Sequence, residues 1–146
     1  MKAYWYEKAG AAADVLEFGE IETPEPGPGE VRVKVAVSAI NPTDWKRRQI
    51  GRELGRFPRI IPNNDGSGII DAVGEGVGPS RIGERVWIFG AQAMRPMGTA
   101  AEFCVLPARQ ARHLVGARYS FDHMIEAHNA VQTEDMFGVC LVGSGD

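Results

Sequence analysis

The sequence contains few of the residues that metal centres and disulfide frameworks need. It has two cysteines and three histidines among 146 residues. Cys104 and Cys140 lie far apart in apolar stretches, which is typical of buried free thiols and indicates a reducing, cytoplasmic location. Zinc is held mainly by Cys and His, with Asp or Glu as further ligands. We therefore expect no metal site and no disulfide framework.

The sequence also lacks a strong charge of one sign and a long apolar run. Sixteen Lys and Arg stand against 19 Asp and Glu, which gives a net charge of −3. Such mild acidity provides no overall attraction to nucleic acid or to anionic lipid. No run is long enough for a transmembrane helix, and the first residues lack the apolar core of a signal peptide. We expect neither a nucleic-acid partner nor a membrane span.

Glycine and proline, in contrast, are plentiful, with 18 and 9 residues. Frequent turns favour short strands, and period-2 alternation of apolar residues is clearest over Val31–Ile40. The chain is therefore predicted to be mainly β, a barrel or sandwich with a few short helices. The expected strands are residues 2–6, 14–22, 31–40, 67–73, 85–89 and 100–106.

Two helices interrupt this pattern. After the strand at 31–40, Pro42 ends the ladder, and Thr43 or Asp44 is expected to cap a short helix that runs through Gln49. Residues 120–131 have apolar side chains at helical spacing, with Ser120 or Asp122 as the cap. A closing strand is predicted at 139–142.

Several stretches, taken in their order and spacing, resemble the N-terminal half of a known family. They resemble the zinc-independent, zeta-crystallin-like quinone oxidoreductases of the medium-chain dehydrogenase/reductase superfamily. The resemblance covers residues 1 to about 113 and implies a GroES-like β-barrel. The stretches are Pro24–Val31, Asn41–Lys46, Pro62–Ile70, Val73–Val77, Ile82–Trp87 and Gly98–Phe103.

The remaining residues resemble a later part of the same catalytic domain. Arg118–His128 is similar to its C-terminal helix and Gly138–Val142 to its closing strand. The resemblance therefore implies a single domain over 1–146, in which 1–113 and 114–146 are joined directly without the Rossmann domain that the family inserts between them. The glycine cluster at 74–78 precedes a loop with Pro79, and not the apolar helix that a dinucleotide site requires.

The resemblance also implies a set of site residues. Asn41, Asp44 and Lys46 match positions that face the nicotinamide end of the cofactor, although Lys46 stands where many relatives have an aromatic residue. The alternative is structural, with Asp44 capping the helix and Asn41 satisfying backbone groups at the end of the strand. Asn64 and Asp65 match a pair that braces the floor of the active site.

Three of these positions argue against a zinc site, and the next residue, Gly66, concerns the backbone geometry. Zinc-binding relatives have a cysteine where Asn41 stands and a histidine–glutamate pair where Asn64 and Asp65 stand, and an amide is a poor zinc ligand. Gly66 is expected to supply a positive φ in a turn.

A basic stretch follows the first helix. It is either a solvated surface or a cleft that attracts an anionic partner. Its arginines are Arg47, Arg48, Arg52, Arg56 and Arg59.

Three functions stay open on this basis. The chain is an NADPH:quinone oxidoreductase reduced to its catalytic domain and inactive alone, a non-catalytic binding or oligomerising module, or an enzyme subunit that uses a nucleotide-binding domain of another chain. NADPH is the cofactor of the full-length family, and none is expected for this chain alone. Apolar surface around 41–46, 90–98 and 113–119 leads us to expect a homodimer, with exchange of the segment from residue 115 onward between protomers.

Overall fold

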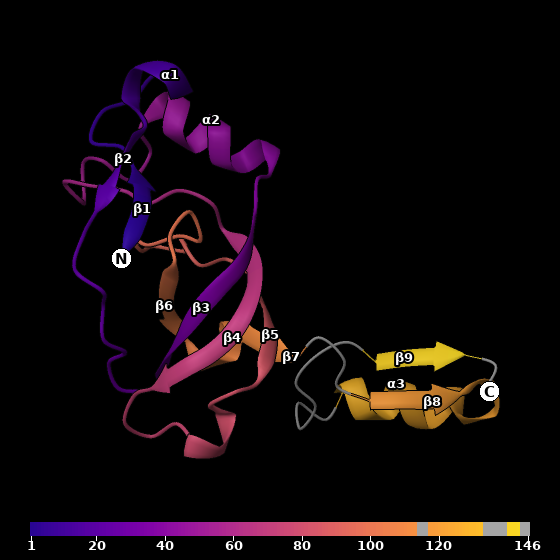
Figure 1. Ribbon diagram of the computed structural model, residues 1–146. Helices are drawn as coiled ribbons and strands as arrows, with labels where there is room; N and C mark the ends of the chain where they lie inside the picture. Colours follow the sequence, from indigo (N-terminus) through magenta and orange to yellow (C-terminus); the bar gives the residue numbers. More distant parts are fainter. Residues whose placement is uncertain (114–116, 133–139, 144–146) are drawn as a thin grey trace. The chain divides into compact units, whose positions relative to one another are not determined.

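The computed structural model describes residues 1–113, 117–132 and 140–143 (Figure 1). These residues form two compact units, Met1–Ala111 and Arg112–Asp146, which are described separately here. That both units belong to one domain stays a prediction.

The N-terminal unit is built on a curved five-stranded sheet with strand order β6-β3-β4-β5-β7. The pairs β3–β4, β3–β6 and β4–β5 are antiparallel, as short connections in a turn-rich chain require. A two-stranded antiparallel sheet of β1 (Lys2–Trp5) and β2 (Glu17–Glu20) completes the unit. The strands of the larger sheet are β3 (Glu30–Ala39), β4 (Asp65–Val73), β5 (Arg85–Ile88), β6 (Phe103–Pro107) and β7 (Ala111–His113), and β7 runs across the boundary between the two units. The predicted mainly-β architecture is confirmed.

Two short α-helices, α1 (Ala12–Val15) and α2 (Pro42–Ile50), lie at one end of this unit (Figure 1). The predicted strand over 14–22 is wrong at its start, because α1 includes residues 14 and 15 and β2 begins only at Glu17. The helical turn places Val15 in a buried cluster with Tyr6 and Ile60. Three 3-10 turns complete the helical content of the described residues: η1 (Pro79–Arg81), η2 (Ala108–Gln110) and η3 (Phe121–His123).

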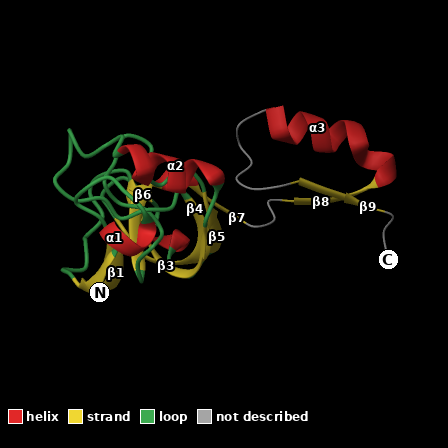
Figure 2. Cartoon of the chain, turned by 90° about the horizontal axis from the view of Figure 1, so that it is seen from above, coloured by secondary structure: helices red, strands yellow, loops and turns green. Residues whose placement is uncertain are grey.

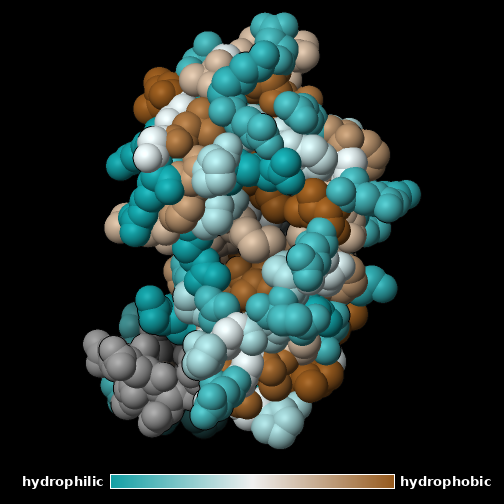
Figure 3. All heavy atoms as spheres, turned by 90° about the vertical axis from the view of Figure 1, so that its left-hand side faces the viewer, coloured by the Kyte–Doolittle hydropathy of each residue, from teal (hydrophilic) through white to brown (hydrophobic). Residues whose placement is uncertain are grey.

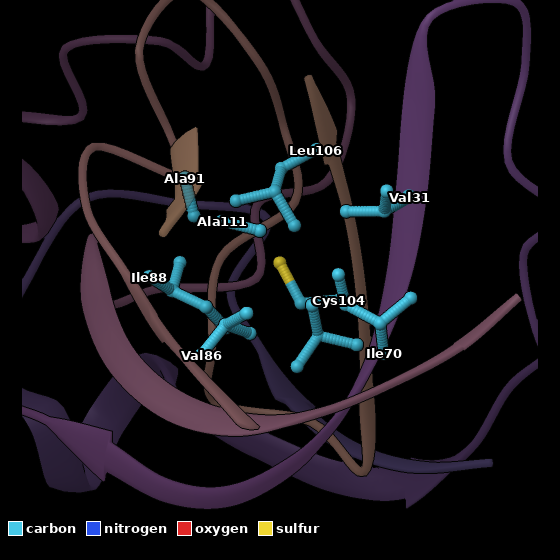
Figure 4. Close-up of a cluster of buried hydrophobic side chains, with 9 residues drawn as sticks. Val31, Ile70, Val86, Ile88, Ala91, Cys104, Leu106 and Ala111 are labelled. Atoms are coloured by element: carbon cyan, nitrogen blue, oxygen red, sulfur yellow. The ribbon is translucent and has the colours of Figure 1, made fainter. Parts of the chain in front are cut away.

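The core lies on the concave side of the larger sheet (Figure 4). Val31 and Val33 alternate with charged neighbours along β3 and are fully buried, as the period-2 pattern predicts. Cys104 points into the middle of this cluster, so the expectation that it is a buried free thiol is confirmed. The other fully buried members are Ile70, Val86, Ile88, Ala91, Leu106 and Ala111.

The C-terminal unit is a β–α–β arrangement (Figure 2). β8 (Ala117–Ser120) and β9 (Cys140–Gly143) pair in parallel, and α3 (Met124–Gln132) covers one face of the pair. The predicted helix and closing strand are present, but residues 118–120 form a strand and not the start of the helix. Residues 138 and 139 of the predicted closing strand lie outside the described residues.

No helix within the described parts of the chain is long and apolar enough to cross a membrane.

We expect Gly68→Ala to lower the free energy of unfolding by more than about 2 kcal/mol. A Cβ at this position would stand 2.1 Å from the carbonyl oxygen of Lys34 in the neighbouring strand. Gly55→Ala is the matched control, because its Cβ would meet no atom within 4 Å. All three tryptophans lie in the N-terminal unit, so urea unfolding followed by tryptophan fluorescence reports on that unit. Equal midpoints for the two variants would contradict the expectation.

We also expect the Cys104 thiol to be inert in the folded protein. Burial raises its pKa to about 12, and only the thiolate reacts with disulfide reagents. In a Cys140→Ser background, an aromatic disulfide reagent at about pH 8 should react with Cys104 only after guanidinium chloride unfolds the protein. Rapid stoichiometric reaction of the folded protein would show that Cys104 is accessible.

Candidate functional site

The candidate site lies where β3 ends and α2 begins. Pro42 is the first residue of α2 and Asn41 its N-cap, so the helix starts before Thr43 and Asp44, the caps predicted from the sequence. Proline suits this position because the first backbone N–H groups of a helix have no intrahelical partner. Asp44 still contributes to capping, since its Oδ2 accepts the backbone N–H of Asn41 at 2.6 Å.

Asp44 also fastens α2 to the segment that precedes β4. Its Oδ1 accepts the backbone N–H of Asn64 at 3.2 Å and the Asn64 side-chain amide at 2.9 Å. The side chain is buried, with 3% of the residue exposed. Both carboxylate oxygens are therefore occupied by protein donors, as a buried charge requires.

Asn64 and Asp65 extend these contacts to the loop after β5. The Oδ1 of Asn64 accepts the backbone N–H of Gln92 at 3.2 Å, and the Oδ1 of Asp65 accepts that of Gly90 at 3.0 Å. The Oδ2 of Asp65 accepts the side-chain amide of Asn41 at 2.7 Å. The structure thus brings Asn41, Asp44, Asn64 and Asp65 together, and we call these four residues the polar junction.

A second group of polar residues, which the sequence did not reveal, lies next to the polar junction. The Thr99 hydroxyl donates to the carbonyl oxygen of Asp65 at 2.7 Å, so the Ser38 hydroxyl donates to Thr99 Oγ1 at 2.8 Å. The side-chain amide of Asn63 donates to Ser38 Oγ at 2.9 Å. Thr99 and Asn63 are buried, and the group links β3, the start of β4 and the loop before β6.

The turn before β4 depends on Asn63 and not on Gly66. Asn63 has a φ of +75°, whereas Gly66 does not have a positive φ, so that prediction was wrong. Asparagine tolerates this left-handed conformation better than most residues. Gly66 is needed for close packing, because a Cβ there would stand 2.6 Å from the carbonyl oxygen of Val37.

Lys46 does not join the polar junction in the structure. It is exposed, and its ammonium group lies 5.6 Å from the centre of the Trp45 ring. The neighbouring arginines have structural contacts: Arg48 is buried and donates to the carbonyl oxygen of Gly10, and Arg47 donates to Asn64 Oδ1 at 3.4 Å. The buried part of the basic stretch therefore contributes to packing.

Arg59, the last arginine of the basic stretch, also has structural contacts, and the pKa of Tyr6 responds to charges on and near α2. The Arg59 guanidinium pairs with Glu7 at 2.9 Å and covers the Trp5 ring. Burial, reinforced by the charge of Glu53, raises the pKa of Tyr6 to about 12, so the phenol keeps its proton at neutral pH.

A pocket of about 300 Å³ opens beside the polar junction. Its lining is mainly apolar and includes Tyr4, Ile40 and Trp45, and its polar groups are Asp44, Arg48 and Asn63. On the face that carries β1 and β2, hydrophobic side chains lie in hollows between polar ones (Figure 3). A mainly apolar concavity with a few polar groups is the usual form of a small-molecule site.

The residues present do not fit a zinc ion. The polar junction offers two amides and two carboxylates whose oxygens already accept protein N–H groups. Within residues 1–113, 117–132 and 140–143, no group of three His, Cys, Asp or Glu side chains could hold a metal.

The glycine cluster at 74–78 also does not form a binding turn for the phosphates of a dinucleotide. This cluster leads into η1, which has three residues, whereas the phosphate-binding fingerprint needs a glycine-rich turn that opens a full helix.

Comparison with known proteins assigns a family model to much of the chain. Residues 27–116 match the alcohol dehydrogenase GroES-like domain. Dehydrogenase orsE of Emericella nidulans is 34% identical over 144 residues, which make up 97% of this chain and 39% of that protein. Starvation-sensing protein RspB of Escherichia coli K12 is 42% identical over 86 residues, 59% of this chain and 24% of that protein. The chain thus spans well under half the length of these relatives.

Solved structures give the same result for the fold. A mycobacterial quinone oxidoreductase is 26% identical with a TM-score of 0.65, over 78% of this chain and 33% of that one. Escherichia coli quinone oxidoreductase in complex with NADPH has a TM-score of 0.67 at 23% identity, over 78% of this chain and 33% of that one. The mainly-β unit therefore has the GroES-like fold that the sequence implied.

We expect Asp44→Ala to lower the free energy of unfolding by about 3 kcal/mol, because it leaves the partly buried donors of Asn41 and Asn64 without an acceptor. Asp14→Ala is the control, since Asp14 also lies in the first turn of a helix but is exposed. That change should cost less than about 0.5 kcal/mol. Urea unfolding followed by tryptophan fluorescence distinguishes the two. A similar small loss in both variants would mean that Asp44 does not hold the junction together.

Proposed function

Because this chain belongs to the family of the alcohol dehydrogenase GroES-like domain, we propose that it is the substrate-binding portion of a zinc-independent, NADPH-dependent quinone oxidoreductase. The observation that carries this proposal is the polar junction beside a mainly apolar pocket. Amides and satisfied carboxylates stand where a zinc enzyme needs thiolate and imidazole ligands. A flat, apolar quinone suits a pocket lined by Tyr4, Ile40 and Trp45.

Of the residues expected to meet the cofactor, Asn41 has the most suitable position. It is half-buried at the end of β3, and its amide is oriented by Asp65. Asp44 is enclosed and acts by holding Asn41 and Asn64 in place. Lys46 is exposed on α2, so its assignment rests on the family resemblance alone.

A domain that the described residues do not include would bind the phosphates of the nucleotide. NADPH is bound in the Escherichia coli quinone oxidoreductase, and this chain spans a third of that one. A nucleotide-binding domain of another chain would complete the enzyme, and the isolated chain would then be inactive. When bound, NADPH would supply the hydride; residues of this chain would bind and orient the quinone. We place the protein in the cytoplasm on the basis of its cysteines.

Exposed apolar side chains favour a second reading, a non-catalytic binding or oligomerising module. Ile40, Trp45, Ile50 and Met94 are exposed to 76%, 49%, 70% and 72%. Monomers seldom leave large apolar patches open. We expect a homodimer for either function, the oxidoreductase portion or the non-catalytic module. Exchange of the segment from residue 115 onward between protomers stays a prediction.

We expect the isolated chain to bind NADPH no more tightly than about 1 mM, because a few hydrogen bonds near Asn41 supply only about 1 kcal/mol each. Titration calorimetry measures this directly. A micromolar dissociation constant would show that this chain itself binds the phosphates. It would overturn the proposal that a separate nucleotide-binding domain binds them.

The substrate half of the proposal is tested with a soluble naphthoquinone. In amide NMR spectra we expect shifts at Tyr4, Ile40 and Asn63, which line the pocket. Trp45→Ala should weaken the shifts, and Ile82→Ala, which removes an exposed apolar side chain outside that pocket, should not. No shift at the pocket residues would favour the non-catalytic module.

A further inference from the structure

Arg48 is a buried cation without an anionic partner. It lies in the last turn of α2, and 9% of the residue is exposed. None of the ion pairs among the described residues includes it. Within the same part of the chain, its guanidinium makes one hydrogen bond, from Nη1 to the carbonyl oxygen of Gly10. Because a buried charge is normally paired, the pocket beside Arg48 is the place to look for its missing partner.

The other N–H groups of Arg48 are accessible. An arginine carries several N–H donors in a planar fork, and no described residue accepts from its Nε or Nη2. These two atoms are nevertheless absent from the fully buried polar atoms without a partner, which belong to Trp5, Glu53, Trp87 and Gln92. Arg48 lines the pocket of about 300 Å³ beside the polar junction. The pocket is therefore the space from which a ligand can reach these donors.

A groove of about 450 Å³ adjoins this pocket and shares four lining residues with it, among them Tyr4 and Ile40. One side of the groove is an open strand edge, because no backbone group of the described residues pairs with 36–40 of β3 on the side away from β4. Arg48 lines the pocket and not the groove. A ligand that reaches Arg48 therefore occupies the pocket, and its other end points to the groove or to the surface.

A quinone has the acceptor that Arg48 lacks. The carbonyl oxygens of a 1,4-quinone lie at opposite edges of a flat ring, so one oxygen can meet the guanidinium while the ring contacts apolar residues such as Leu16 and Trp45. Asp44, the other charged residue of the lining, offers no donor, and its oxygens accept from Asn41 and Asn64. Arg48 is thus the charged donor of this lining.

We propose that Arg48 binds a ring carbonyl oxygen of the quinone and thereby determines the orientation of the substrate in the pocket. This inference rests on the proposed function, because it concerns the same pocket. A hydrogen bond from a charged donor is stronger than one between neutral groups, and it strengthens further when the acceptor is also charged. The substrates that fit are flat compounds with a carbonyl oxygen at the edge that enters the pocket.

The test compares two ligands of nearly the same shape, 2-methoxy-1,4-naphthoquinone and 2-hydroxy-1,4-naphthoquinone, of which the second is an anion at neutral pH. Amide NMR titrations of the full chain, followed at Tyr4 and Ile40, measure the dissociation constant of each. We expect the unaltered chain to bind the anion more tightly. Arg48→Met should weaken binding of the anion at least about tenfold and that of the methoxy compound by a smaller factor.

Arg52→Met is the matched control. It also removes one positive charge, from an exposed arginine in the turn after α2 that does not line the pocket. The ratio of the two dissociation constants should stay as in the unaltered chain. If Arg48→Met fails to fold by circular dichroism, Arg48→Gln replaces it, because the amide keeps a donor for the Gly10 carbonyl oxygen and removes the charge.

The outcomes separate this proposal from the proposed function. A purely structural role of Arg48 would weaken binding of both quinones by the same factor, which would overturn the proposal and leave the proposed function intact. An equal change of the ratio in Arg52→Met would also overturn it, because the preference would then come from long-range charge. Absence of shifts at the pocket with either quinone would overturn the proposed function together with the role of Arg48.

Discussion

The geometry of the candidate site depends on two carboxylates, Asp44 and Asp65. Between them they accept the N–H groups of Asn41, Asn64 and Gly90 from three different segments. Desolvating a carboxylate is costly unless its lone pairs are satisfied, so these oxygens determine how closely the segments approach. The end of β3, the start of α2, the start of β4 and the loop after β5 are thereby held in a fixed arrangement.

The hydrogen bonds of Asp44 and Asp65 also determine which kind of ligand the site could bind. Because Asp44 and Asp65 are fully engaged by N–H groups, neither is free to act as a metal ligand. The pocket lining is mostly apolar, and its two charged residues, Asp44 and Arg48, are already hydrogen-bonded within the protein. Such a surface orients a neutral, flat molecule through few hydrogen bonds and much contact area.

Much of this could be read from the sequence, and the exceptions have physical causes. Period-2 alternation located β3, since one face of that strand is buried against a single core. The four-residue helix α1 was missed because a single turn has no periodicity; packing of Val15 against Tyr6 and Ile60 stabilises it.

The closeness of Asn41 to Asp65 was implied by the family resemblance, whereas the contact of Ser38 with Thr99, 61 residues apart, had no local signal. The positive φ of Asn63 was assigned to Gly66 because glycine is the usual residue there.

A single topological feature gives rise both to the pocket and to the open edge of β3. The segment 100–107 pairs with β3 only as far as Val35 and then turns to pair with β1. Where the two strands diverge, the sheet cannot close, and Tyr4 of β1 faces Ile40 across the gap in both concavities. Had 100–102 continued along β3, the edge at Ala36–Ile40 would be paired and the groove would be filled by backbone. An opening for a ligand in this barrel therefore entails an unpaired strand edge beside it, and whatever covers that edge also limits access to the site.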